Sequence, residues 1–262
     1  MKLNKNLSQN FLIDPGVSIQ IVEETELEPN DEVLEIGPGE GALTEMILQQ
    51  TPNVTAVEID LRWVGLLKEN FKETSLKVIE ADFLKDPAQF FKNKKNLVVM
   101  GNIPYHISTP IVEALVENKS HIKKIVLMTQ KEYGEKLMLF EKGNSKLSYF
   151  AGLHFEVEML FIVPRKVFKP MPQVDSAIVR LIPRFDLEGQ IKNKDLYQKL
   201  LEAAFFSKRK KIRNNFERSS HLFGGKENIK FIEEKSGISF DKRAEHLTLE
   251  EYIKLSNLIG LL

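Results

Sequence analysis

The sequence contains no cysteine in its 262 residues. This absence excludes disulfide bonds, thiolate nucleophiles, cysteine zinc sites and iron–sulfur clusters, and it fits a reducing compartment. No apolar run approaches the length of a membrane-spanning helix, and the N-terminus lacks the apolar core of a signal peptide. We therefore expect a cytoplasmic protein with no membrane partner.

The sequence also has no net charge, because 37 Lys and Arg balance 37 Asp and Glu. The two signs are nevertheless separated along the chain. Residues 21–90 carry 16 acidic and 5 basic residues, whereas residues 161–220 carry 14 basic and 6 acidic residues. Clustered cations suit a polyanion such as RNA, but two solvated surfaces of opposite sign explain the pattern equally well. Charge alone leaves both interpretations open.

Short apolar runs typical of buried strands alternate with segments of helical periodicity over the first two thirds of the chain. This order predicts a parallel sheet covered by helices on both faces. Residues 157–163 and 174–182 lack a long helix between them, so we expect them to end the sheet as an antiparallel pair. The other predicted strands are 33–36, 54–59, 76–79, 97–100 and 125–128, and the predicted helices are 15–27, 42–50, 62–71 and 109–117.

The pattern changes after Pro183, where helical periodicity continues without a convincing strand. The chain is long enough for one large domain and a small one. We therefore predict an α/β, Rossmann-like domain over residues 1–187 and a small all-α domain over residues 188–262. No exposed heptad or long apolar stripe argues for a dimer, so we expect a monomer.

A glycine-rich loop with Gly37 and Gly39 follows the first of these strands. Glycine allows the backbone to turn tightly and to approach a ligand closely. Glu58 ends the next strand, where a carboxylate can accept hydrogen bonds from both hydroxyls of a ribose. With Ala42 the loop also satisfies the dinucleotide fingerprint, so an NAD cofactor remains open at this point.

Two further carboxylates favour a nucleoside without a pyrophosphate. Glu35, just before the glycines, would repel a phosphate but can hold the ammonium of a methionine moiety, directly or through water. Asp82 follows the third strand and can bind an adenine amine, although a role as a helix cap or strand-end carboxylate explains it equally well. Together, Glu35, Glu58 and Asp82 point to S-adenosylmethionine, which is cationic at its sulfur and its ammonium.

The stretch Asn102, Ile103, Pro104 and Tyr105 follows the fourth strand. An adenine N6 is a poor nucleophile, because its lone pair is delocalised into the ring. Two acceptors on its hydrogens would localise that lone pair and stabilise the positive charge of the transition state. The Asn102 side-chain oxygen and the Ile103 carbonyl are the candidates, since Pro104 favours an extended Ile103. Tyr105 can stack on the base. This chemistry requires no metal and no strong general base.

The same stretch has simpler explanations. An isolated Asn-Ile-Pro-Tyr is more often a turn after a strand, and only its position in the alternating pattern favours a site. His106 is better explained as a loop histidine than as a general base.

Five cations lie within six residues near the start of the predicted helical domain. On a helix they would form a broad collar, which suits phosphate contacts better than base reading. A solubilising helix end is the alternative. We favour RNA contact by this set, which comprises Lys208, Arg209, Lys210, Lys211 and Arg213.

In order and spacing, these motifs resemble the KsgA (RsmA) family of small-subunit rRNA adenine N6,N6-dimethyltransferases over nearly the whole chain. The matching stretches are residues 9–12, 35–44, 101–110, 168–177 and 208–215. The resemblance implies a Rossmann-like, S-adenosylmethionine-dependent methyltransferase fold with a helical C-terminal domain. It implies cofactor contacts from Asn10, Leu12, Gly37, Glu58, Asp82 and Asn102.

The resemblance also implies the substrate. Asn102, Ile103 and Tyr105, with Phe168 on the opposite face, would hold the target adenine. A ring between Lys166 and Lys169 suits a flipped base, whereas the residues alone favour a core position for Phe168. The implied reaction dimethylates two adjacent adenosines in a 3′-terminal stem-loop of 16S rRNA, within the small ribosomal subunit or its precursor.

Some positions depart from the family pattern. Ser8 and Ile103 replace the usual Gly and Leu, as in the related Erm enzymes that dimethylate a 23S rRNA adenine. Val174, Asp175 and Ser176 and the basic stretch favour the small-subunit family, and the 143–148 segment is shorter than usual. An Erm-type enzyme, an NAD-dependent oxidoreductase and a non-catalytic RNA-binding assembly factor remain the alternatives.

Overall fold

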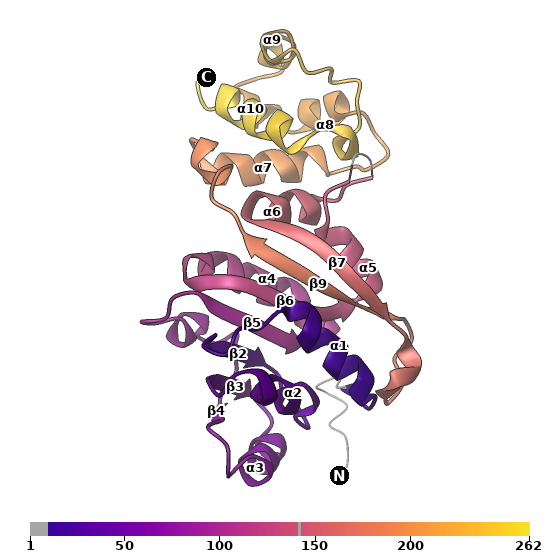
Figure 1. The fold of residues 1–262 in the computed structure, drawn as a ribbon. Coiled ribbons are helices and arrows are strands. Elements are labelled where there is room, and N and C mark those ends of the chain that lie inside the picture. Colours follow the sequence, from indigo (N-terminus) through magenta and orange to yellow (C-terminus); the bar gives the residue numbers. More distant parts are fainter. Residues whose placement is uncertain (1–9, 141–142) are drawn as a thin grey trace. The chain divides into compact units, whose positions relative to one another are not determined.

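The structure is a computed structural model that describes residues 10–140 and 143–262, except for the side chain of Tyr105 (Figure 1). The chain forms two compact units. The described part of the first unit comprises residues 10–135 and 156–183, and the second unit comprises residues 136–155 and 184–262. We expected one boundary after residue 187. The observed division falls after Pro183, and residues 136–155 join the second unit because Tyr149 and Leu153 belong to its hydrophobic core.

The first unit is built on a mainly parallel sheet. The sheet order is β4-β3-β2-β5-β6-β9-β7. Strands β2 to β6 pair in parallel with their neighbours, and β9 pairs antiparallel with β6. The predicted end of the sheet is therefore confirmed, with β9 and β7 as its last two strands. The strands are β2 (Val33–Ile36), β3 (Val54–Glu58), β4 (Lys77–Glu80), β5 (Leu97–Asn102), β6 (Ile122–Gln130), β7 (Phe155–Val163) and β9 (Ser176–Pro183).

The first helix of the first unit begins where local chemistry predicts. Helix α1 starts at Pro15 with Asp14 as its cap, whose carboxylate accepts the Gly16 amide. Ile21 of α1 and Ile47 of α2 pack against strand residues such as Val98 in one buried cluster, so these helices cover one face of the sheet. The helices are α1 (Pro15–Thr25), α2 (Ala42–Gln50), α3 (Leu61–Asn70), α4 (Ser108–Glu117) and α5 (Lys131–Leu137).

A small second sheet was not predicted from the sequence. Strand β1 (Phe11–Leu12) pairs antiparallel with β8 (Phe168–Lys169), and Leu12 lies opposite Phe168. Each strand contains only two residues, which is too short for a periodic signal. This pairing brings the N-terminal stretch of the described chain alongside the segment between β7 and β9.

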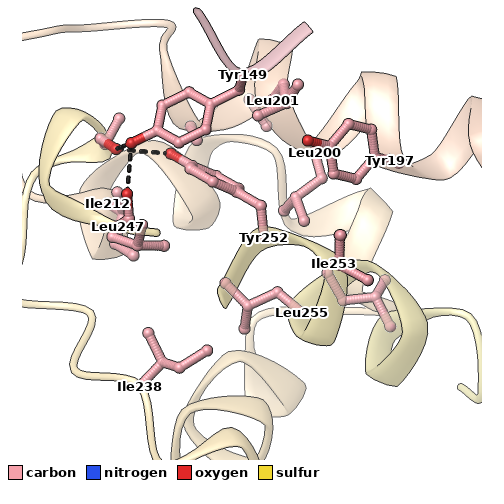
Figure 2. Close-up of a cluster of buried hydrophobic side chains, with 14 of the residues drawn as sticks. Tyr149, Tyr197, Leu200, Leu201, Ile212, Ile238, Leu247, Tyr252, Ile253 and Leu255 are labelled. Atoms are coloured by element: carbon pink, nitrogen blue, oxygen red, sulfur yellow. Dashed lines mark hydrogen bonds between the residues drawn. The ribbon is translucent and has the colours of Figure 1, made fainter. Parts of the chain in front are cut away.

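The second unit is mainly helical and has its own core. Figure 2 shows Tyr149 from α6 and Tyr252 from α10 with their hydroxyl groups at one edge of this core. The Tyr252 hydroxyl donates to the Ala244 carbonyl at 2.9 Å, and the Tyr149 hydroxyl donates to the Leu247 carbonyl. These bonds satisfy polar groups inside an apolar cluster. The helices are α6 (Lys146–His154), α7 (Lys194–Ala204), α8 (Ile212–Arg218), α9 (Glu227–Ser236) and α10 (Leu249–Ile259).

Within residues 10–140 and 143–262, no helix has both the length and the apolar character needed to cross a membrane.

The two buried tyrosines allow a matched test of this core. Tyr149→Phe should lower the free energy of unfolding by about 1–3 kcal/mol, because the buried Leu247 carbonyl loses its donor. Tyr197→Phe is the control, since the buried Tyr197 hydroxyl has no hydrogen-bond partner among the described residues. That change should be neutral or stabilising. Urea denaturation measures both, and an equal loss in the two variants would contradict the role of the Tyr149 hydroxyl.

Candidate functional site

A cavity of about 240 Å³ lies in the first unit, where the carboxyl ends of the parallel strands meet. This edge is where open α/β sheets bind ligands. The cavity is lined from β1, from the ends of β2, β3 and β5, and from the loops that follow β2 and β4. All the residues predicted to bind a cofactor line it: Asn10, Leu12, Glu35, Gly37, Gly39, Glu58, Asp82 and Asn102.

The glycine loop is shaped by one close approach and one hydrogen bond. Gly39 has a φ of +55°, and a Cβ there would lie 2.9 Å from the Phe11 ring. Its amide donates to Glu58 Oε2 at 3.0 Å. Only glycine combines this backbone conformation with this proximity at no cost. The loop is therefore held between the end of β3 and the Phe11 ring.

Glu58 is positioned by backbone amides. Its side chain is buried at the end of β3, where Oε2 accepts the Gly39 amide and Oε1 accepts the Asp60 amide at 2.9 Å. Burial raises the pKa of Glu58, and the two amides oppose that rise. Each carboxylate oxygen can still accept a further bond. The geometry suits a ligand that offers two neighbouring hydroxyls, as a ribose does.

Glu35 is the most deeply buried acid of the cavity. It is 1% exposed, and its Oε2 accepts a hydrogen bond from the Thr44 hydroxyl at 2.6 Å. Burial raises the pKa of Glu35 to about 7, the negative charge of Glu58 adds to this rise, and the Thr44 bond opposes it. A cation in the cavity would stabilise the ionised form of Glu35 against burial and against the charge of Glu58. A pyrophosphate would add further negative charge. The lining therefore fits the cationic S-adenosylmethionine better than NAD.

Asp82 caps a turn and lines the cavity. Its Oδ1 accepts the Leu84 amide at 3.0 Å, so the carboxylate caps the turn after β4. The same residue is exposed and lines the cavity. The capping bond fixes the direction of a carboxylate that remains accessible to a ligand amine.

The Asn102 side chain is oriented by a contact that the sequence did not reveal. Its Nδ2 donates to the carbonyl of Asn10, the residue just before β1, at 3.2 Å. The Oδ1 atom is then the part of the amide that can accept from a ligand. The Ile103 amide donates to the Met128 carbonyl at 3.3 Å, which continues the alignment of β5 with β6.

Gly101 has a structural role that the sequence analysis did not assign. A Cβ at this position would lie 2.6 Å from the Ile36 carbonyl oxygen, which belongs to the neighbouring strand β2. Glycine therefore allows β5 and β2 to come close just before Asn102. The sequence analysis also did not predict the hydrogen bond from Thr44 to Glu35. The position of Thr44 in the first turn after the glycine loop is a sequence signal for this contact.

The Phe168 ring lies in the apolar core of the first unit. Phe168 is 3% exposed and packs in the apolar cluster with Leu12 and Val167, because β8 pairs with β1. The ring is not part of the cavity lining, and its position opposite the target adenine stays a prediction of the family resemblance. The Tyr105 side chain lies outside the described residues. Ile103 and Pro104 both line the cavity.

We expected the basic segment to form a helical collar, but it does not. Helix α8 begins only at Ile212, and the preceding cations lie in a turn. Arg213 makes two bonds to the Glu233 carboxylate at 2.9 and 2.7 Å, and Lys211 bonds to Asp241 at 3.1 Å. These two side chains already neutralise acids within the second unit. Lys208, Arg209 and Lys210 are exposed, with no ion pair recorded in the described part of the chain.

The buried Glu35 predicts how stability depends on pH. Its folded pKa of about 7 exceeds the ordinary value of 4.5, so the folded state holds this proton more tightly than the unfolded state. The contribution is full below pH 4.5 and is lost as pH rises through 7, with a total on the order of 3 kcal/mol. Glu35→Gln should flatten this dependence.

Urea denaturation of the ligand-free protein between pH 5 and 8 measures the effect. Glu45→Gln, an exposed position on α2, is the matched control. If wild type and Glu35→Gln lose stability in parallel over this range, the raised pKa is not a property of Glu35.

Comparison with known proteins adds a family assignment to this geometry. Residues 1–260 match the family described as ribosomal RNA adenine dimethylase. A ribosomal RNA small subunit methyltransferase A from Latilactobacillus sakei subsp. sakei (strain 23K) is 36% identical over 271 residues, which cover 99% of this chain and 90% of the relative. The protein of the same name from Bacillus pumilus (strain SAFR-032) is 35% identical over 266 residues, covering 97% and 90%.

Two solved structures are similar over both chains. A dimethyladenosine transferase from Plasmodium falciparum has a TM-score of 0.77 and 29% identity, covering 95% of this chain and 98% of its own. The 23S rRNA methyltransferase ErmE has a TM-score of 0.71 and 28% identity, covering 95% and 99%. These similarities confirm the predicted Rossmann-like methyltransferase fold.

Proposed function

The chain belongs to the ribosomal RNA adenine dimethylase family, and on that premise we propose that it methylates N6 of two adjacent adenosines in a 3′-terminal stem-loop of 16S rRNA. The product is N6,N6-dimethyladenosine, and the reaction belongs to the maturation of the small ribosomal subunit. S-adenosylmethionine is the methyl donor of the family and the cofactor of this enzyme. The family match confirms the resemblance that the sequence motifs indicate.

One observation carries this proposal. The acidic cavity ends at Asn102, whose amide nitrogen is engaged by the Asn10 carbonyl and whose oxygen is left as an acceptor. A cofactor pocket and a hydrogen-bond acceptor for an amine thus share one wall. This is the arrangement that methyl transfer to an exocyclic amine requires.

The protein's residues account for cofactor binding. The bound cofactor supplies an electrophilic methyl group on a sulfonium. Glu58 is positioned for the ribose hydroxyls and Asp82 for the adenine amine, while Glu35 provides negative charge near the methionine part. Because Glu35 and Glu58 are buried, their attraction for a cation is weakly screened. This charge pattern also disfavours the pyrophosphate of NAD, which argues against an oxidoreductase.

The acceptor side of the site activates an unreactive nitrogen. The Asn102 Oδ1 and the Ile103 carbonyl accept the two N6 hydrogens of the target adenine and localise its lone pair. They also stabilise the positive charge that grows on N6 in the transition state. The methylated ammonium loses its proton without a strong base. For the second transfer, one hydrogen remains for one of these two acceptors.

The RNA partner is proposed from the family and from the second unit. The relatives with 35–36% identity are small-subunit methyltransferases by name, whereas ErmE is 28% identical. This difference supports 16S rRNA over 23S rRNA as the substrate. Lys208, Arg209 and Lys210 are exposed and suited to phosphate contacts. We further propose that the enzyme acts as a cytoplasmic monomer.

Asn102→Ala tests the acceptor chemistry. Loss of the Oδ1 acceptor should lower the rate constant for methyl transfer by about 100- to 1000-fold, as removal of one transition-state hydrogen bond does in other enzymes. The protein should still bind S-adenosylmethionine, because the carboxylates of the cavity remain. Single-turnover methylation and calorimetry separate the two effects. A rate within tenfold of wild type would remove Asn102 from the chemistry and favour a non-catalytic explanation of the site.

Substrate choice separates the proposal from the Erm-type alternative. Small subunits that lack the modification should receive label from methyl-labelled S-adenosylmethionine, and digestion of their 16S rRNA should yield dimethyladenosine. Large subunits and naked 23S rRNA are the matched substrates and should remain unlabelled. Exclusive labelling of 23S rRNA would overturn the proposal in favour of the Erm-type reaction.

A further inference from the structure

Phe206 is a large apolar side chain that the second unit leaves in solvent. It follows α7 and is 56% exposed. Its neighbour Phe205 packs inward, with its ring centroid 5.7 Å from Tyr149 and 6.4 Å from Tyr252. The chain therefore packs one of two adjacent phenylalanines against the core and exposes the other, which forfeits the stabilisation that burial of the second ring would provide.

One face of the exposed ring is covered by a planar cation. The Arg218 guanidinium, at the end of α8, lies 3.8 Å from the centroid of the Phe206 ring. An arginine in this position makes a cation–π contact with the ring. The remaining exposure of Phe206 shows that the arginine does not enclose the ring. We call this partly exposed pair the platform.

Hydrogen bonds from a buried side chain fix the conformation of the turn that carries Phe206. Asn215 is 2% exposed, and its Nδ2 donates to the Ala204 carbonyl at 2.6 Å and to the Ser207 carbonyl at 3.2 Å. These two acceptors lie on either side of the two phenylalanines. The Lys210 amide also donates to the Ser207 carbonyl at 3.1 Å. A ligand would therefore meet a platform that needs little ordering on binding.

Three cations lie close to Phe206 in the sequence. Lys208, Arg209 and Lys210 begin two residues after Phe206 and are exposed, and they make no ion pair within the described part of the chain. The acid of α7 closest in sequence, Glu202, is paired with Lys146 at 3.5 Å. An aromatic face beside clustered cations is the combination that binds single-stranded nucleic acid.

We propose that Phe206 and Arg218 form a stacking site for one unpaired nucleobase of the RNA substrate. Lys208, Arg209 and Lys210 neutralise the phosphates that flank this nucleotide. The site rests on the proposed RNA substrate but is separate from the cavity where the methyl group is transferred. Because every base has a π-face, the site selects unpaired over paired RNA rather than one base over another.

A purely structural role for the pair makes a different prediction. If Arg218 only shields the Phe206 ring from water, replacing Phe206 changes stability and leaves RNA binding unchanged. Phe206→Leu distinguishes the two roles, since leucine keeps an apolar side chain but has no ring to stack. Phe206→Trp restores an aromatic face.

The binding test uses the full chain with two fluorescent RNAs, a single-stranded octamer and a blunt-ended duplex of eight base pairs. Phe206→Leu should weaken octamer binding by about 5- to 100-fold, with duplex binding unchanged and Phe206→Trp close to wild type. Phe231→Ala is the matched control, because Phe231 is 54% exposed on α9 of the same unit. It should leave both affinities unchanged.

The salt dependence separates stacking from charge. Phe206→Leu should leave the slope of log affinity against log salt unchanged, because a ring neutralises no phosphate. Lys208→Gln should reduce the slope for the octamer by about 0.7. The proposal is overturned if Phe206→Leu and Phe231→Ala bind the octamer equally, or if Phe206→Leu weakens both RNAs to the same extent.

Methylation of unmodified small subunits by the same wild-type preparation keeps the two proposals apart. If the subunits are methylated and Phe206→Leu binds the octamer like wild type, only the stacking site fails. If wild type does not methylate them, the proposed function fails, and the octamer measurement still decides whether Phe206 stacks on RNA.

Discussion

The hydrogen bonds between the buried Glu58 carboxylate and the backbone amides of Gly39 and Asp60 organise the site. One oxygen holds the glycine loop that leads into α2, and the other holds the residue that caps α3. A single side chain at the end of β3 thus joins the glycine loop, which lines the cavity, to the start of α3. These bonds also set the direction in which its remaining lone pairs face a ligand.

The cavity concentrates negative charge where water is largely excluded. Glu35 and Glu58 are both buried. Burial raises the pKa of Glu35 to about 7, and the negative charge of Glu58 adds to this rise. Two carboxylates in this environment are costly without a cation. A cofactor that carries positive charge would compensate this cost, and on this ground we propose that the glycine loop of this chain serves a sulfonium cofactor.

The sequence predicted which residues lie together wherever those residues stand at the ends of strands. Residues that follow successive parallel strands must meet at one edge of the sheet, so Glu35, Glu58 and Asn102 could be brought together from their spacing alone. Contacts between distant short segments had no such signal. The Asn10 carbonyl that orients Asn102 and the two-residue strands that bury Phe168 were therefore not predicted.

Contacts between distant residues also decide the structure of the basic segment, and the sequence did not predict them. Its cations were read as a helical collar, but buried Asn215 bonds to two carbonyls of the preceding turn and α8 starts later. Composition identified the charge correctly, whereas the partners of Lys211 and Arg213 lie about 20 to 30 residues away in the sequence. Only the folded second unit shows which cations are neutralised internally.

Proton release on cofactor binding is the measurement that tests the account most directly. Calorimetric titration of S-adenosylmethionine at pH 7 in buffers of different ionisation enthalpy counts the protons released. Because Glu35 titrates near pH 7 in the free protein, wild type should release about half a proton more than Glu35→Gln when a cation enters the cavity. Equal proton release by the two proteins would contradict the claim that buried carboxylates match this site to a cationic methyl donor.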